Sequence, residues 1–141
     1  MRTVYYNEIV EKVSQMCQEA NYDLNDDVIG AFRNALKSEK SDTGKDVLNQ
    51  LLLNAAIAKK DRVPMCQDTG VAVFLVKFGQ DVHIVGGNLN EAINEGVKKG
   101  YKEGFLRHSI VNHPLKREKS SDYNAPAVIH VEVVPGDKIE I

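Results

Sequence analysis

Three segments in the first half of the chain have the hydrophobic spacing of amphipathic helices. Apolar residues recur every three or four positions over residues 4–20, 25–38 and 43–60, and this spacing places them on one face of a helix. The stripe in the third segment is wide, so that helix is expected to be buried on more than one side. Asn25 is expected to cap the second helix. Pro64 ends the third, because proline lacks an amide N–H and disfavours helical geometry in the preceding residue.

Four later segments have the pattern of β-strands. Residues 71–77 form a nearly continuous apolar and β-branched run, which predicts a strand buried on both faces. Residues 82–85 follow a Gly-Gln-Asp turn and are expected to pair with that strand as a hairpin. Residues 127–134 alternate with a period of two, and residues 138–141 alternate again after a Pro-Gly-Asp turn.

A fourth helix, predicted over residues 88–106, has an unusual face. Gly96, Gly100 and Gly104 are four residues apart, so they lie on one side of the helix. Each glycine costs about 1 kcal/mol relative to alanine inside a helix. We therefore expect another backbone to approach this side closely. Asn88 is expected to cap the helix.

These elements predict an α+β fold in a single domain of residues 1–141. Three N-terminal helices are expected to pack on a small mixed or antiparallel sheet, with the glycine-striped helix as the crossover between strands. A length of 141 residues suits one domain, and 43% apolar residues are sufficient for a core.

Composition and charge exclude several classes of protein. The formal net charge is -2 and the isoelectric point is about 6.1, so nothing attracts nucleic acid or an anionic membrane globally. A mean hydropathy of -0.33 and the lack of a long apolar run exclude a transmembrane span. Two cysteines, in a chain whose N-terminus has no apolar signal segment, favour a reducing, cytoplasmic location.

The most concentrated chemistry lies in the loop between the third helix and the first predicted strand. Cys66, Gln67, Asp68 and Thr69 supply a thiol, an amide, a carboxylate and a hydroxyl at consecutive positions, and Gly70 lets the chain turn. Polar groups on a loop between two rigid elements are typical of a reactive site. The simpler alternative is that Cys66 is a half-buried loop residue and that Asp68 or Thr69 stabilises a turn.

Other candidate ligands have a more ordinary interpretation. Cys17 falls on the apolar face of the first helix, so we expect it to be buried and not bonded to Cys66. His108 and His113 follow Arg107, which would repel a cation, and we expect them to be exposed loop histidines.

A pair of glycines, Gly86-Gly87, precedes the fourth helix. It could bind an anion on free backbone N–H groups or simply lead into the helix. Residues 116–122 are polar and are expected to be solvated surface.

The loop from Pro64 to Gly70 resembles the cluster-binding loop of class I, iron–sulfur fumarate hydratases and their L(+)-tartrate dehydratase relatives. Further blocks follow in family order, and they comprise residues 107–111 with Pro114-Leu115 and Arg117, residues 124–130, and residues 134–137. Together the blocks span most of the chain from residue 47 onward. They resemble the N-terminal half of the family's α subunit or of its single-chain equivalent.

The resemblance implies a hydro-lyase that reversibly hydrates fumarate to malate, as in the tricarboxylic acid cycle. In this family a 4Fe–4S cluster with one open iron acts as a Lewis acid on the substrate. The resemblance implies that Cys66 is a metal ligand, that Gln67, Asp68 and Arg107 bind the dicarboxylate substrate, and that Asp68 is also catalytic. The implied partners are the remaining α region and a β subunit or C-terminal domain, in a homo-oligomer.

The chain departs from the family in its cysteines. Three thiolates hold the cluster in the family, and Cys17 is the only other cysteine. We therefore expect the chain to be the N-terminal part of a larger enzyme, and to be inactive and without a cluster by itself. Ala125, where threonine is expected, and His113, where an acid is expected, leave tartrate or a methylated fumarate open as substrates. A non-catalytic docking module and a redox-sensing thiol at Cys66 are alternative functions.

Overall fold

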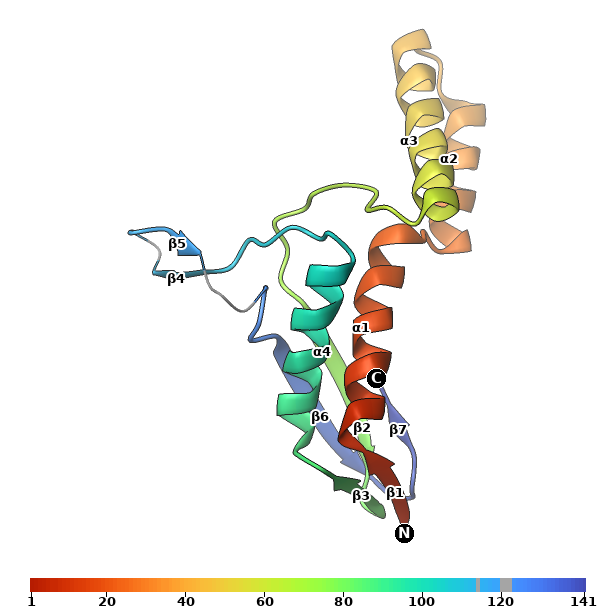
Figure 1. The fold of residues 1–141 in the computed structure, drawn as a ribbon. Coiled ribbons are helices and arrows are strands. Elements are labelled where there is room, and N and C mark those ends of the chain that lie inside the picture. Colours follow the sequence, from red (N-terminus) through yellow and green to blue (C-terminus); the bar gives the residue numbers. More distant parts are fainter. Residues whose placement is uncertain (114, 120–122) are drawn as a thin grey trace.

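The computed structural model of the protein describes residues 1–113, 115–119 and 123–141 (Figure 1). Two parts of the predicted features lie outside the described residues. They are Pro114, from one of the family blocks, and residues 120–122, from the polar segment. The elements in chain order are β1 (Arg2–Tyr5), α1 (Tyr6–Tyr22), α2 (Asp26–Ser38), α3 (Asp42–Asp61), β2 (Val73–Gly79), β3 (Val82–Val85), α4 (Leu89–Glu103), β4 (Val111–His113), β5 (Glu118–Lys119), β6 (Val128–Val134) and β7 (Ile139–Glu140). The predicted α+β class is confirmed.

Helices α1 and α4 pack side by side, and the glycines of α4 allow their backbones to approach (Figure 1). A Cβ atom added to Gly96 would lie 2.6 Å from Cβ of Val13 and 2.8 Å from the carbonyl oxygen of Val10. One added to Gly100 would lie 2.8 Å from the carbonyl oxygen of Ser14. The predicted close approach of another backbone is confirmed, and the approaching element is α1.

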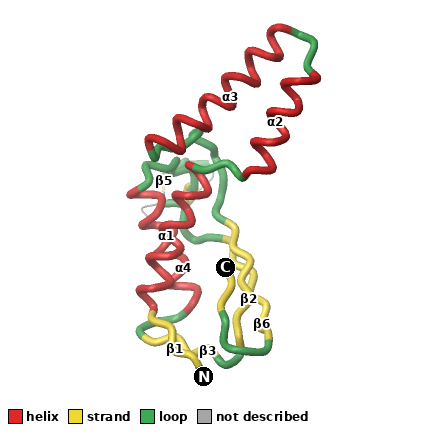
Figure 2. Tube along the Cα trace, turned by 90° about the vertical axis from the view of Figure 1, so that its right-hand side faces the viewer, coloured by secondary structure: helices red, strands yellow, loops and turns green. Residues whose placement is uncertain are grey.

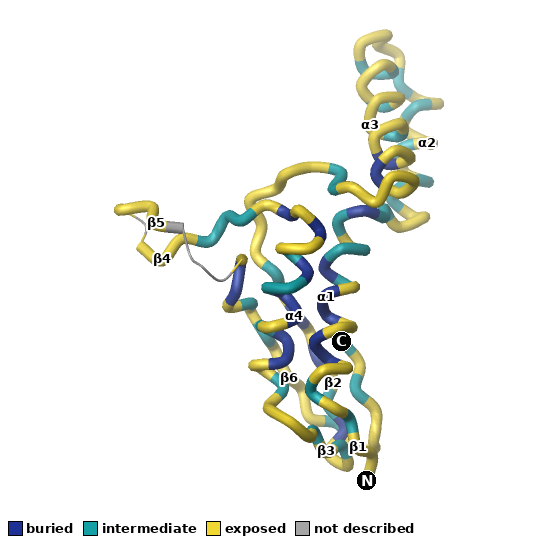
Figure 3. The backbone as a smooth tube through the Cα atoms, viewed as in Figure 1, coloured by how far each residue is buried: buried dark blue, intermediate teal, exposed yellow. Residues whose placement is uncertain are grey.

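The core lies between this helix pair and one face of a mixed sheet (Figure 2). The sheet has the order β6-β2-β7, in which β2 is parallel to β6 and antiparallel to β7. Figure 3 shows that buried positions gather where α1 and α4 face each other. Burial of each large core side chain contributes roughly 1.5–3 kcal/mol. The most completely buried apolar residues, at most 2% exposed, are Val13, Ala58, Val76, Ala92, Ile93 and Val97.

Strand β2 is buried on one face only, which corrects the prediction of two buried faces. Phe74 and Val76 lie in the core, whereas Val73 is 57% exposed and Leu75 is 73% exposed. Both α1 and α4 lie on the same side of the strand (Figure 2). An apolar run in a sequence predicts a strand, but it does not show which face of the strand another element covers.

The N-terminus forms a strand where the helical pattern predicted the start of the first helix. Residues 2–5 pair in parallel with β3, with Arg2 opposite Val82. Helix α1 begins at Tyr6. The backbone N–H of the preceding residue, Tyr5, donates to the carboxylate of Glu8 at 3.0 Å. The helix therefore starts two residues later than predicted.

Strand β3 is not the hairpin partner of β2, so that prediction is wrong. The turn that follows β2 is held by the end of β6 and by the turn after it, because Gln80 N donates to Val134 O and Asp81 N donates to Gly136 O, each at 2.9 Å. Gly79 is needed here, since a Cβ atom would lie 2.8 Å from Lys138 O. Strand β3 consequently lies away from β2 and pairs with β1.

Helices α2 and α3 form a hairpin that projects away from the sheet (Figures 1 and 3). No residue of α2 is buried. The expectation that the third helix is buried on more than one side is wrong for this chain, because four large apolar residues of α3 are 41–61% exposed, namely Val47, Leu51, Leu53 and Ile57. Of the three N-terminal helices, α1 is the one that covers the sheet. In the described part of the chain, no helix has the length and apolarity to cross a membrane.

The helix boundaries agree with the predictions to within a few residues. Asn88 is the N-cap of α4, and its side chain accepts from the backbone N–H of Glu91 at 2.9 Å. Asn25 occupies the N-cap position of α2, although its side chain makes no capping hydrogen bond. Helix α3 ends before Pro64, with Arg62 in the left-handed conformation at φ 53°.

A single methyl group added where the glycines of α4 pack on α1 is expected to have a large effect on stability. Gly96→Ala is expected to lower the free energy of unfolding by about 1–3 kcal/mol, because the new Cβ overpacks against Val13 and Val10. The matched control is Gly30→Ala in α2, where no atom lies within 4 Å of the added Cβ. That variant should gain about 0.5–1 kcal/mol from helix propensity. Urea unfolding followed by circular dichroism measures both variants. Equal effects of the two substitutions would refute the close packing of Gly96 against α1.

Candidate functional site

The loop between α3 and β2 carries the predicted chemistry on its outer surface. Its first part is fixed, because Met65 N donates to Asn21 O at 3.0 Å and the Asn54 side-chain amide donates to Met65 O at 2.8 Å. The following residues, Cys66 to Thr69, are all exposed. Their thiol, amide, carboxylate and hydroxyl are therefore accessible on a loop whose start is anchored.

Arg107 lies against this loop. Its Nη1 donates to the backbone carbonyl of Gln67 at 2.9 Å, and Nε2 of Gln67 donates to the carbonyl of Phe105 at 3.3 Å. The chain reaches this position because Phe105, at φ 53°, reverses its direction after α4. Arg107 and Gln67 are both exposed. The described contacts use one of the five guanidinium N–H groups, so Arg107 retains the donors needed to bind an anion.

Asp68 has a structural contact as well as an exposed carboxylate. Its Oδ1 accepts from the backbone N–H of Thr69 at 2.8 Å. A Cβ atom on Gly70 would lie 3.1 Å from its Oδ2. Asp68 thus makes a local hydrogen bond to the backbone of the next residue, and residues 66–70 form no turn that it could stabilise.

Asn124 joins the loop, the segment after α4 and the start of β6. It is fully buried, and its Oδ1 accepts from the backbone N–H groups of Ser109 at 2.7 Å and Ile110 at 3.0 Å. Its Nδ2 donates to Gly70 O at 3.2 Å and to Ser109 Oγ at 3.0 Å. Ser109 Oγ donates in turn to Gly70 O at 2.9 Å. This network fixes the end of the Cys66 loop relative to Arg107.

The role of Asn124 was missed from the sequence, although the residue begins one of the family blocks. The residue type was the available signal, because asparagine tolerates the left-handed conformation. In the structure Asn124 adopts this conformation, with φ 63°. Tyr101 of α4 lies beside it. Burial raises the pKa of the Tyr101 phenol, and a hydrogen bond with Asn124 opposes that rise. The phenol therefore stays protonated at neutral pH as part of the buried network.

The two histidines differ in their surroundings. His113 is exposed, as predicted, and its Nδ1 accepts from the backbone N–H groups of Leu115 and Lys116, each at 3.3 Å. The prediction for His108 is wrong, because its ring stacks on Tyr123 with centroids 5.3 Å apart. Its Nε2 is buried and has no hydrogen-bond partner among the described residues.

The two cysteines are unbonded, as predicted, and lie in different environments. Cys17 is buried in the core, and burial raises the pKa of its thiol to about 11. Cys66 is exposed on the loop. Within residues 1–113, 115–119 and 123–141, no three His, Cys, Asp or Glu side chains gather closely enough to hold a metal ion. Cys66 is thus a single accessible thiol on the loop, whereas an iron–sulfur cluster needs several thiolates.

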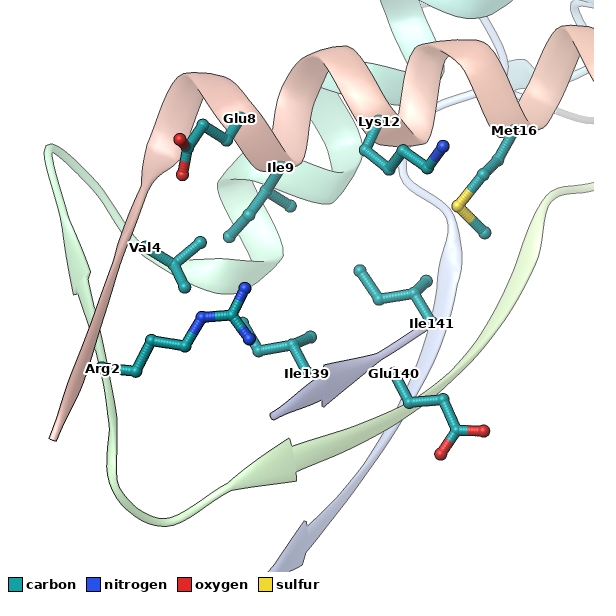
Figure 4. A pocket seen from close by; sticks show the side chains of 9 residues that line it. All are labelled: Arg2, Val4, Glu8, Ile9, Lys12, Met16, Ile139, Glu140 and Ile141. Carbon is teal, nitrogen blue, oxygen red and sulfur yellow. The ribbon is translucent and has the colours of Figure 1, made fainter. Parts of the chain in front are cut away.

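Two other features lie apart from this site. A groove of about 600 Å³ runs between β1, α1 and β7 (Figure 4), and no predicted site residue lines it. At the start of α4, the ring of Tyr6 packs directly against Gly87. The side chain of Asn88 caps the helix there, so the Gly86-Gly87 pair leads into the helix under an aromatic ring.

Comparison with known proteins identifies relatives over most of the chain. The family model for fumarate hydratase (Fumerase) matches residues 10–141. A Methanocaldococcus jannaschii protein that carries the name L(+)-tartrate dehydratase subunit alpha is 38% identical over 111 residues, which cover 78% of this chain and 39% of that protein. The aerobic class I fumarate hydratase of Escherichia coli K12 is 41% identical over 102 residues, or 71% of this chain and 18% of that enzyme.

A eukaryotic relative gives the same picture. The mitochondrial fumarate hydratase 1 of Leishmania major is 39% identical over 100 residues, which cover 70% of this chain and 18% of that enzyme. The matched part of the chain thus spans between 18% and 39% of the length of these three relatives.

The Asn124 network predicts that an isosteric change destabilises the site. Asn124→Asp removes the donor to Gly70 and buries a carboxylate, so we expect the free energy of unfolding to fall by roughly 2–4 kcal/mol. The amides of Ser109 and Ile110 should also exchange faster with solvent. Asn49→Asp, the same substitution on an exposed position of α3, should change stability by less than about 0.5 kcal/mol. Urea unfolding and amide exchange measure both variants, and equal stability of the two would contradict the assigned role.

Proposed function

The chain belongs to the fumarate hydratase family, and on this premise we propose that it is the N-terminal part of an iron–sulfur hydro-lyase that reversibly hydrates fumarate to malate. The names of the bacterial and Leishmania relatives support the reaction. The complete enzyme would add the remaining α region and a second subunit or C-terminal domain. The name subunit alpha of the Methanocaldococcus relative supports that division.

The contact between Arg107 and Gln67 is the observation that carries this proposal. It brings a guanidinium and a side-chain amide from segments 40 residues apart onto one exposed surface. A four-carbon dicarboxylate has two carboxylates, and a guanidinium can bind one of them through two parallel hydrogen bonds. Gln67 would donate to a carboxylate oxygen beside it. The two residues together would orient the substrate over the loop.

Asp68 would act on the hydroxyl end of the substrate. Its Oδ1 is held by the backbone N–H of Thr69, which leaves Oδ2 to accept a hydrogen bond from the malate hydroxyl or to move a proton. It lies next to Gln67 in the chain, so a substrate oriented by Arg107 and Gln67 would present its reacting carbons near this carboxylate.

Cys66 would be the ligand that this chain contributes to a 4Fe–4S cluster. When bound, the cluster supplies an open iron that serves as a Lewis acid for the substrate hydroxyl. Cys17 is unsuited to join it, because its thiol is buried against α4 and has a pKa of about 11. The other thiolates would come from outside these 141 residues, and we propose that this chain alone is inactive.

Among four-carbon dicarboxylates, fumarate is the first candidate substrate. Tartrate is the second, because a relative that aligns with 78% of this chain carries the name of an L(+)-tartrate dehydratase subunit. A methylated fumarate and a non-catalytic docking role are the remaining alternatives. We further propose that the complete enzyme is a homo-oligomer in the cytoplasm that serves the tricarboxylic acid cycle.

Reconstitution of the complete enzyme with iron and sulfide under anaerobic conditions tests the cluster ligand. Cys66→Ser is expected to lose the visible absorption of the cluster and at least about 99% of the hydratase activity, since a hydroxyl is a poor ligand for this iron. Cys17→Ala is the control, and it should keep the absorption. Assays with fumarate, malate and L(+)-tartrate identify the substrate. A serine variant with a full cluster and full activity would remove Cys66 from the site.

The substrate-binding role of Arg107 predicts a different defect. Arg107→Lys is expected to leave the cluster spectrum unchanged and to raise KM about 10- to 100-fold, because lysine loses the two-point contact with a carboxylate. Arg33→Lys on the distant α2 is the matched control and should have wild-type kinetics. Steady-state kinetics on the reconstituted enzyme measure both, and an unchanged KM for the Arg107 variant would rule out the proposed contact.

A further inference from the structure

Helix α3 carries a line of exposed residues that recur at alternating spacings of four and three. They form the α3 seam, which consists of Asp46, Gln50, Leu53, Ile57 and Lys60. Residues at this spacing lie on one side of a helix, as they do along the contact between two helices that pack lengthwise. The two apolar side chains are at the middle, where Leu53 is 61% exposed and Ile57 is 46% exposed.

Helix α2 covers the other side of α3. Leu52 and Ala55 of α3 line a groove together with Ile29 of α2. At 3.6 residues per turn, Leu53 and Ile57 lie about 100° or more around the helix from these two residues. The wide apolar stripe of α3 therefore has one side against α2 and a second side that no described residue covers. The hairpin that carries the seam projects away from the sheet and from β7 (Figure 1).

The α3 seam is complementary to a second copy of itself. Its first residue, Asp46, is acidic, its last, Lys60, is basic, and Leu53 is midway between them. In an antiparallel pair centred on Leu53, Asp46 of each copy lies opposite Lys60 of the other, and the two Leu53 side chains meet on the two-fold axis. A parallel pair would instead place like charges opposite each other. Among the described residues, neither Asp46 nor Lys60 forms an ion pair within the chain, so both charges are available to a partner.

We propose that α3 pairs with α3 of a second copy of the enzyme, antiparallel and centred on Leu53. The inference rests on the proposed function, because that function includes a homo-oligomer, but it does not depend on the reaction. The two Asp46–Lys60 contacts would select the antiparallel direction, and Leu53 would exclude water at the centre. Val47 and Leu51, which are 50% and 41% exposed, widen the apolar surface along one flank.

Charge exchange on the 141-residue chain tests the direction of the pair, and sedimentation at several concentrations measures the dimer Kd. Asp46→Lys and Lys60→Glu each place like charges at both ends of the pair, so each should raise the Kd at least about tenfold. A mixture of the two variants has opposite charges at both ends again, and it should form a heterodimer about as tight as the original dimer. Lys37→Glu is the matched control, because Lys37 is exposed in the last turn of α2 as Lys60 is in the last turn of α3. It should leave the Kd unchanged.

Cross-linking of the complete enzyme tests the two-fold axis. Leu53→Cys would place two thiols next to each other on the axis, so mild oxidation should give a dimer linked through position 53 of both copies. Asn34→Cys, on an exposed position of α2, is the control and should give no such link. Mass spectrometry of the linked peptides identifies the position.

The inference requires both the charge pattern and the link. A 141-residue chain that stays monomeric, or that dimerises equally well with either charge reversed, would overturn it. An active complete hydratase without a link at position 53 would overturn the α3 pairing alone, because another part of the enzyme would then cover the seam. A link at position 53 in a complete protein without hydratase activity would support the pairing and overturn the proposed function.

Discussion

The close contact between the backbones of α1 and α4 is the constraint on which the rest of the structure depends. Glycines at positions 96 and 100 remove the side chains that would hold the helices apart, so the two helices form one layer over β2. Phe74 and Val76 are buried as a result. At the end of α4, the hydroxyl of Tyr22 in α1 donates to the carbonyl of Gly104 at 3.0 Å, and the left-handed Phe105 then directs the chain to the Cys66 loop. The position of Arg107 is thus a consequence of helix packing.

A single buried amide connects that framework to the exposed chemistry. Asn124 satisfies backbone groups of Gly70, Ser109 and Ile110, which would each cost about 1–3 kcal/mol if buried without a partner. The site therefore has a buried polar support beneath an exposed surface of thiol, amide, carboxylate and guanidinium. This division explains why the exposed side chains can be read from the sequence as candidates, whereas their support cannot. Cys66, Gln67 and Asp68 are adjacent in the chain, whereas Asn124 is 54 residues from Gly70.

The same distinction explains what the sequence predicted about the fold. Helical periodicity and the glycine spacing are local signals, and the corresponding elements and the α1–α4 contact are present. Strand partners depend on residues far apart, so the parallel pairing of residues 2–5 with β3 was missed. The apolar run of β2 predicted a strand correctly, but it could not report that both covering helices lie on one side. His108 was misjudged for a similar reason, because Tyr123 reaches it from another segment.

The proposed function gives the exposed apolar surface and the incomplete ligand set one explanation. Leu75 is 73% exposed, and leaving such a side chain in water forgoes roughly 25 cal/mol per Å² of apolar area that burial would recover. A lone exposed thiol likewise has no use as a cluster ligand until other thiolates are brought near it. Both deficits would be removed by the same event, the docking of further polypeptide.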